Sequence, residues 1–213
     1  MTMCLPDDEW ARIKKEALES IIEDRIIGYL DPYIDPILIA INEVPLLATT
    51  SSCIGRIVIV EGSRYWLRDK ARIVYKSHDH ITVDDLKRVL RRPFKDLWLI
   101  ASGPILHIKS PSFSCSLEVI ASARESGFKH SGIISAKNFY VIELMSSTQI
   151  YMPLRLKGTD LIDERGLEVL VDMANKTVDE GRQRLSRIVE GIRGLRSCQG
   201  SIGSSRESGQ LKD

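Results

Sequence analysis

The chain has 213 residues, of which 43% are hydrophobic and 28% are charged, which is the composition of a globular protein that can bury a core without metals or disulfides. Thirty Lys and Arg residues against 29 Asp and Glu residues give a formal net charge of +1, which excludes a protein that coats nucleic acid through bulk charge. Any contact with RNA must therefore come from local basic patches.

The cysteine spacing and the apolar runs exclude two further classes. Four cysteines, Cys4, Cys53, Cys115 and Cys198, lie far apart without a C-x-x-C pair, so we expect no zinc finger and no other metal site. Scattered, unpaired thiols are typical of a reducing cytosol. The acidic start lacks the apolar region of a secretory signal, and the longest apolar run, residues 37–48, is too short to span a membrane. We expect a cytoplasmic protein without a membrane partner.

The first predicted elements in chain order are two helices. Acidic residues after Pro6, followed by apolar residues every three to four positions, predict a helix over 7–27. Asp35 as the N-cap and Pro36 at the first helical position start a second, shorter helix, which must end before Pro45.

After the second helix the composition becomes β-branched and predicts strands. The predicted strands are LLATT, RIVIVE, ARIVYKS, LWLIA, ILHIKS, GIIS, FYVIEL and QIYMPL. Further helices are predicted over 84–92, 112–126 and 163–193. Without regular βαβ alternation, this order predicts an α+β fold of antiparallel hairpins with packed helices, not a doubly wound Rossmann-type fold. We expect a single domain over 1–199 and a disordered Gly/Ser-rich tail over 200–213, because the tail has little apolar surface to bury.

Residues 49–56 form the most unusual segment, because four consecutive hydroxyl residues are followed by Cys, Gly and Arg between two apolar strands. We expect a turn there whose hydroxyls and free backbone N–H groups bind a carboxylate, phosphate or ribose, with the guanidinium of Arg56 as a charged hydrogen-bond donor. The alternative is a polar turn whose hydroxyls bond only to the local backbone.

Three of the histidines also suggest chemistry. His78 and His80 are spaced like a metal pair, but no third ligand is in view, and loop exposure is the simpler interpretation. His107 is polar within an apolar strand, so it is either a satisfied core histidine or part of a pocket wall. The mixed face that it shares with Ile105 and Lys109 favours a pocket wall.

A basic run on the third predicted helix is the strongest local patch of positive charge. Its members are Lys87, Arg88, Arg91 and Arg92. Spacing of three and four residues places several of them on one helix face. That face is either simply solvated or contacts the phosphates of an RNA.

Six short motifs together carry a resemblance to a known family. TTSSC-x-GRI at residues 49–57 is the most specific of them. The others are G-x-x-D at 28–31, IVYKSH at 73–78, ILHI at 105–108, A-x-x-x-GF-x-x-SGI at 123–133, and a serine pair followed by MPL at 146–154. In these motifs the chain resembles the tRNA methyltransferases of the wybutosine pathway, from about Gly28 to the last predicted helix.

The resemblance implies an S-adenosylmethionine-dependent enzyme of archaea or eukaryotes. Its implied partner is tRNA(Phe), methylated at the N-4 ring nitrogen of 7-(3-amino-3-carboxypropyl)-4-demethylwyosine beside the anticodon. The implied donor-binding residues are Thr50, Ser51, Ser52, Cys53, Gly55, Arg56, Ser146 and Ser147. The implied substrate-pocket residues are Ser131 and Gly132, and the RNA contacts expected from the basic run are Lys87, Arg88, Arg91 and Arg92. The candidates for the base that takes the proton from the acceptor nitrogen are His107, His78 and Asp31; we expect His107 to orient or deprotonate the tricyclic base, with His78 as the second choice.

The chain departs from the family pattern at three positions expected to face the site. Ser102 stands where the family usually has an acidic residue, Met145 where it has Arg, and Tyr151 where it often has Glu. These departures leave two alternatives beside the methyltransferase: a related protein with an altered substrate, and a non-catalytic tRNA-binding paralogue. A small-molecule binding module unrelated to RNA is a third.

Overall fold

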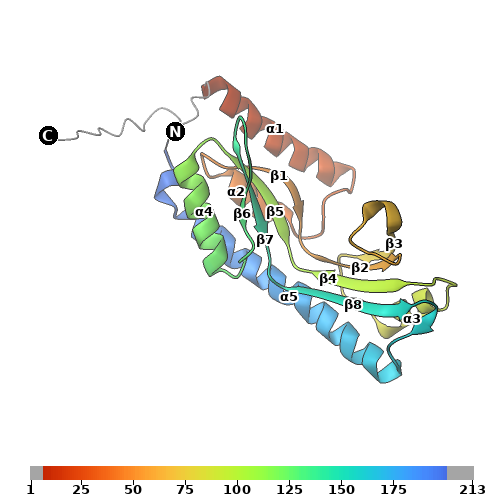
Figure 1. Ribbon diagram of the computed structural model, residues 1–213. Helices are drawn as coiled ribbons and strands as arrows, with labels where there is room; N and C mark the ends of the chain where they lie inside the picture. Colours follow the sequence, from red (N-terminus) through yellow and green to blue (C-terminus); the bar gives the residue numbers. More distant parts are fainter. Residues whose placement is uncertain (1–6, 201–213) are drawn as a thin grey trace.

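The computed structural model describes residues 7–200, which combine helices with two antiparallel sheets (Figure 1). The α-helices are α1 (Asp7–Ile26), α2 (Asp35–Asn42), α3 (Val83–Leu90), α4 (Phe113–Glu125) and α5 (Glu164–Arg193), and the short 3-10 helices are η1 (Arg68–Lys70) and η2 (Arg196–Cys198). The predicted α+β fold is confirmed, and the layout is not doubly wound. Within residues 7–200, no helix has both the length and the apolar character needed to cross a membrane.

The strands divide into a first sheet of order β1-β5-β7-β6 and a second sheet of order β3-β2-β4-β8-β9. Their bounds are β1 Ala48–Cys53, β2 Arg56–Glu61, β3 Arg72–Ser77, β4 Leu97–Ser102, β5 Ile105–Ser110, β6 Gly132–Ala136, β7 Tyr140–Met145, β8 Gln149–Leu156 and β9 Thr159–Asp160. Every pairing between them is antiparallel.

The two sheets meet at an elbow, where β1 continues into β2, β4 into β5, and β7 into β8. The backbone is crowded there: the Gly103 N–H donates to the Thr148 carbonyl at 2.8 Å, and a Cβ on Gly103 would lie 2.2 Å from the Thr148 hydroxyl. A Cβ on Gly181 of α5 would lie 2.6 Å from Cδ of Pro104. Gly55, in the crossing from β1 to β2, has a φ of +96°, which favours glycine. Glycine at these positions therefore lets the strands change sheets against α5.

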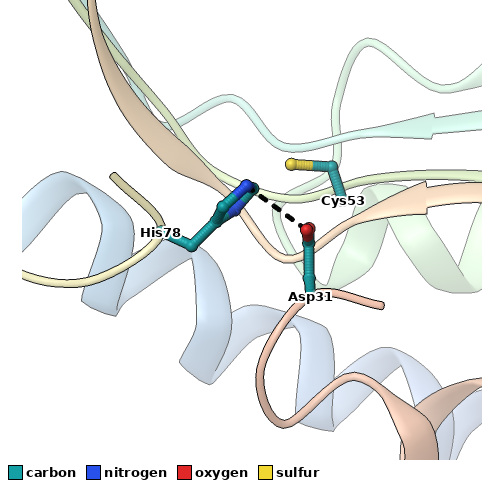
Figure 2. A group of neighbouring side chains, drawn as sticks. All are labelled: Asp31, Cys53 and His78. Atoms are coloured by element: carbon teal, nitrogen blue, oxygen red, sulfur yellow. Dashed lines mark ion pairs between the residues drawn. The ribbon is translucent and has the colours of Figure 1, made fainter. Parts of the chain in front are cut away.

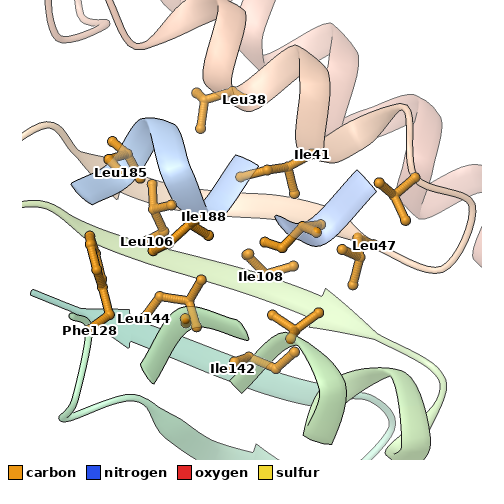
Figure 3. Packing of buried hydrophobic residues seen from close by; sticks show 14 of the residues in the cluster. Leu38, Ile41, Leu47, Leu106, Ile108, Phe128, Ile142, Leu144, Leu185 and Ile188 are labelled. Carbon is orange, nitrogen blue, oxygen red and sulfur yellow. The ribbon is translucent and has the colours of Figure 1, made fainter. Parts of the chain in front are cut away.

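Helix α5 lies behind both sheets and joins two hydrophobic clusters (Figure 1). Leu185 and Ile188 in its C-terminal half pack with Leu106 and Ile108 of β5 and with Ile142 and Leu144 of β7 (Figure 3). Its N-terminal half packs on the second sheet through Leu170, Ala174 and Val178. Side chains alternate along a strand, so the next residues point away from α5. We call that opposite side the front face; it carries Arg56, Val58, Ile100, Ile105 and His107.

Helix α1 closes one end of the first sheet. Trp10 is buried, and the Lys14 ammonium donates to the carbonyls of Asn42, Val44 and Leu47, the last two at 2.8 and 2.7 Å. These carbonyls lie at or beyond the end of α2, where no helical donors remain. Burial lowers the pKa of Lys14 to about 8.

The predicted turn over residues 49–56 is wrong. Most of the segment belongs to β1, which pairs with β5 rather than forming a hairpin with β2. Two of its hydroxyls have partners outside the segment: the Thr49 hydroxyl accepts from the Asn42 side chain at 2.6 Å, and the Thr50 hydroxyl donates to the His107 carbonyl at 3.2 Å. Because these hydroxyls bond to residues outside the segment, the segment can be an extended strand instead of a turn.

The expectation of four unpaired thiols is also wrong, because Cys115 and Cys198 form a buried disulfide between α4 and η2. They are 83 residues apart in sequence, and spacing alone does not bring them together. Cys53 is a free thiol. The predicted Gly/Ser-rich tail falls, apart from Gly200, outside the described residues, and the single domain over 1–199 stays a prediction.

Candidate functional site

Asp31, Cys53 and His78 come from three separate segments and meet beside the elbow (Figure 2). His78 directly follows β3, and its Nε2 lies 3.3 Å from Oδ1 of Asp31. Its Nδ1 lies 3.2 Å from the Gly55 carbonyl, so each ring nitrogen faces an oxygen acceptor. The other Asp31 oxygen accepts the Ile54 N–H at 3.0 Å. The carboxylate is therefore held on both oxygens, and we call Asp31 and His78 the dyad.

Cys53 is the third member of this cluster. Burial, and next the negative charge of Asp31, raise the pKa of the Cys53 thiol to about 11. The group is therefore a neutral thiol at physiological pH and not a thiolate nucleophile. Potential ligand atoms of the three residues lie within 4.8 Å of one another, and carboxylate, thiol and imidazole are all groups that bind zinc. The sequence-based expectation of no metal stays a prediction.

A pocket of about 440 Å³ contains this cluster, and we call it the dyad pocket. Among its lining residues are Asp31, Ser52, Cys53, Arg56, Lys76 and His78. The hydroxyl oxygen of Ser52 is buried without a hydrogen-bond partner in the described chain. Arg56 and Lys76 are exposed at the pocket, and neither has an acidic partner within residues 7–200. An unpaired buried hydroxyl beside two free cations suits a ligand with polar and anionic groups.

His107 belongs to a second polar cluster on the front face of the first sheet. Its Nε2 lies 2.8 Å from the Glu143 carboxylate, and its Nδ1 lies 2.6 Å from the Ser51 hydroxyl. About a quarter of its side chain is exposed, at 26%, so it is not in a dry core. Thr50 and Ser51 also line a pocket of about 400 Å³ between α1 and β1. The structure thus brings Asp31 and His78 together and gives His107 different partners.

The other predicted polar residues use their hydroxyls inside the protein. Ser146 is buried and bonds to the Thr148 hydroxyl at 2.8 Å. Ser147 donates to the Gly127 carbonyl at 2.8 Å, and buried Ser131 donates to the Phe128 carbonyl at 2.6 Å. Their predicted roles in binding the donor or the substrate stay predictions.

Gly132 lies on β6 opposite Glu143, the partner of His107. No atom lies within 4 Å of where its Cβ would be. The glycine therefore leaves open space beside the second polar cluster, and its predicted place in the substrate pocket stays a prediction.

The predicted basic face lies on α3, beside the N-terminal part of α5 (Figure 1). Lys87 pairs with Glu164 of α5, and Arg88 lies 3.7 Å from Asp85. Arg91 and Arg92 follow the helix and are exposed. Only half of the predicted set is therefore without an acidic partner in the described part of the chain.

A third pocket, of about 450 Å³, was not predicted from the sequence and lies on the front face of the second sheet. We call it the aromatic pocket; its lining includes Arg56, Val58, Tyr65, Ser102, Met145 and Tyr151. Arg56 lines both pockets. All three residues that depart from the family pattern line this one cavity. The aromatic residues between β2 and β3 are the sequence feature from which it could have been predicted.

Comparison with known proteins places the chain in a family. The family described as Methyltransferase TYW3 matches residues 12–194. A protein of Aeropyrum pernix named tRNA(Phe) 7-((3-amino-3-carboxypropyl)-4-demethylwyosine(37)-N(4))-methyltransferase is 40% identical over 182 residues, which cover 84% of this chain and 97% of that protein. A protein of Saccharolobus solfataricus with the same name is 37% identical over 83% of this chain and 86% of its own length.

Solved structures agree with this assignment. The PH1069 protein from Pyrococcus horikoshii superposes with a TM-score of 0.81 at 28% identity, over 92% of this chain and all of that chain. A hypothetical protein from Aeropyrum pernix gives a TM-score of 0.75 at 38% identity, over 79% of this chain and all of that one. The chain therefore belongs to the Methyltransferase TYW3 family and is an enzyme of that class.

Proposed function

We propose that the chain transfers a methyl group from S-adenosylmethionine to the N-4 ring nitrogen of 7-(3-amino-3-carboxypropyl)-4-demethylwyosine in tRNA(Phe), in the cytoplasm. The names of relatives that align over most of their length support this substrate. The intact cluster of Asp31, Cys53 and His78 in a polar pocket favours catalysis over the non-catalytic alternative.

The dyad pocket fits the methyl donor. The single observation that carries this assignment is the buried Ser52 hydroxyl, which lacks a partner within residues 7–200. Arg56 and Lys76 would pair the carboxylate of the donor, and the Ser52 hydroxyl would bond to one of its polar groups. When bound, S-adenosylmethionine supplies an electrophilic methyl group on a sulfonium sulfur.

The dyad supplies the proton acceptor for the reaction. The carbon–sulfur bond breaks as the carbon–nitrogen bond forms, and the hydrogen on the acceptor nitrogen must leave. The Asp31 carboxylate takes that proton, while the Ile54 N–H and His78 hold it in place. His78 is a positioning residue here. Cys53 remains a thiol and fills the pocket wall. Most of the remaining rate enhancement comes from alignment of donor and acceptor.

The exposed arginines that follow α3 can contact the phosphate backbone of the tRNA. Arg91 and Arg92 are exposed and have no acidic partner within residues 7–200, although the Arg92 guanidinium lies 4.9 Å from the centre of the Phe94 ring, whereas Lys87 must first leave Glu164. We propose that this end of the second sheet contacts tRNA outside the modified nucleotide.

Calorimetry and a methyl-transfer assay test this function. The wild-type chain should bind S-adenosylmethionine and methylate precursor tRNA(Phe), and Ser52→Ala combined with Arg56→Ala should weaken donor binding roughly tenfold or more. The matched control is Ser63→Ala with Arg64→Ala, two exposed residues of the loop after β2 that line neither pocket. Donor binding that is equal in the two double variants would contradict the assignment of the dyad pocket.

A further inference from the structure

We propose that the aromatic pocket binds the tricyclic base of the substrate by stacking, while the dyad pocket holds the donor. This inference rests on the proposed function and assigns the acceptor to a cavity away from Ser131 and Gly132, the substrate-pocket residues expected from the sequence. It replaces Ser131, which is buried and bonded to backbone, as the centre of the substrate pocket.

The shape of the aromatic pocket matches a flat ring system. Val58, Ile100 and Tyr151 are direct neighbours across β2, β4 and β8, so their side chains form one row on the front face. Tyr65, from the loop after β2, stacks on Tyr151 with ring centroids 5.4 Å apart and planes inclined by 26°. The Trp98 ring packs against the Tyr65 ring, with centroids 4.9 Å apart. An apolar floor beside a supported aromatic wall is the kind of surface on which unpaired bases stack.

The position of the aromatic pocket matches the needs of group transfer. Donor and acceptor must lie in contact for the methyl group to move between them. Arg56 lines both pockets, so the two cavities adjoin along this side chain. The proposal therefore places the reacting nitrogen at the edge that the two pockets share, where it meets the methyl group and Asp31, and the rest of the ring system above Val58 and Tyr151.

The charge of the lining indicates which part of the base lies here. Arg56 is the one ionisable group with a permanent charge among the described lining residues, and none of these residues is a carboxylate. The ring system and an anionic substituent fit such a cavity, whereas an ammonium group would find no carboxylate to pair with and would lie near the positive charge of Arg56. We place the amino group of the substrate side chain in solvent, where it adds little to recognition.

Tyr151→Leu tests the stacking contact with tRNA(Phe) that carries the tricyclic precursor and with the same tRNA lacking it. The wild-type chain should bind the precursor form more tightly, and Tyr151→Leu should reduce that preference roughly tenfold. Tyr151→Phe should retain the preference because it keeps the ring. Phe113→Leu is the matched control, since Phe113 is a partly exposed aromatic residue of α4 outside the pocket.

Three outcomes separate this inference from the proposed function. A wild-type chain that neither binds S-adenosylmethionine nor methylates the precursor contradicts the proposed function itself. An active wild type whose Tyr151→Leu variant keeps the full preference for the precursor overturns the stacking site. A Tyr151→Leu variant that loses donor affinity instead overturns it as well, because the two pockets would then have exchanged ligands.

Discussion

The reactivity of Cys53 provides a direct measure of the electrostatics of the dyad pocket. Burial and the Asp31 charge raise its pKa from an ordinary 9.0 to about 11. At pH 8 about one thiol in 10³ is then ionised, against about one in 10 for an ordinary thiol, so alkylation should be about 100-fold slower. Asp31→Asn removes the charge, lowers the pKa and should accelerate alkylation roughly threefold or more at pH 8.

The assay is iodoacetamide alkylation followed by intact-mass spectrometry in a Cys4→Ser background. Cys115 and Cys198 are bonded to each other and do not react, so Cys53 is the remaining thiol. Asp79→Asn is the control, because this exposed carboxylate is not among the charges that shift Cys53. Alkylation of the wild type at the rate of an ordinary thiol, or no acceleration in Asp31→Asn, would refute the described environment.

Three further predictions concern the surface and the stability. Arg91→Glu with Arg92→Glu should reduce the slope of log affinity for tRNA against log salt by about 2, and Lys87→Glu should reduce it less. Slopes equal to that of the wild type would mean that these residues are solvated and do not contact tRNA. Cys198→Ser opens the disulfide and should lower the free energy of unfolding by about 2–4 kcal/mol in urea titrations; an unchanged midpoint would contradict it. The pKa of Lys14 is about 8 in the folded chain against an ordinary 10.5, so the unfolded chain binds more protons between these two pH values. The free energy of unfolding should therefore rise from pH 8 toward 10.5, and Lys14→Met should lack this rise. The same pH dependence of unfolding in the wild type and in Lys14→Met would refute the prediction.

Much of the secondary structure follows from local sequence. ILHIKS is the strand Ile105–Ser110, and the predicted helix over 163–193 is Glu164–Arg193, because alternation and helical periodicity are local signals. The partner of β1 was not predictable in this way. The change of sheet between Cys53 and Arg56 depends on β5, which lies about fifty residues further along the chain, and on crowding at Gly103.

The candidate site was predicted residue by residue but not as an arrangement. Asp31, Cys53 and His78 were each named from motifs, and only the fold brings them within 4.8 Å. His107 was the first choice of base from the sequence, ahead of His78, and its pairing with Glu143 depends on the register of β5 and β7. Tyr65 carried no motif, because its stacking on Tyr151 joins a loop to a distant strand.

Single-turnover methyl transfer to precursor tRNA(Phe) tests the role of the dyad most directly. Asp31→Asn should lower the rate roughly 10²–10⁴-fold at neutral pH while calorimetry shows that the variant still binds the donor. His107→Asn and the exposed His80→Asn, measured beside it, should stay within about tenfold of the wild-type rate, since neither group belongs to the dyad pocket. An Asp31→Asn variant with a near-normal rate, or a His107→Asn variant that alone loses activity, would contradict the account.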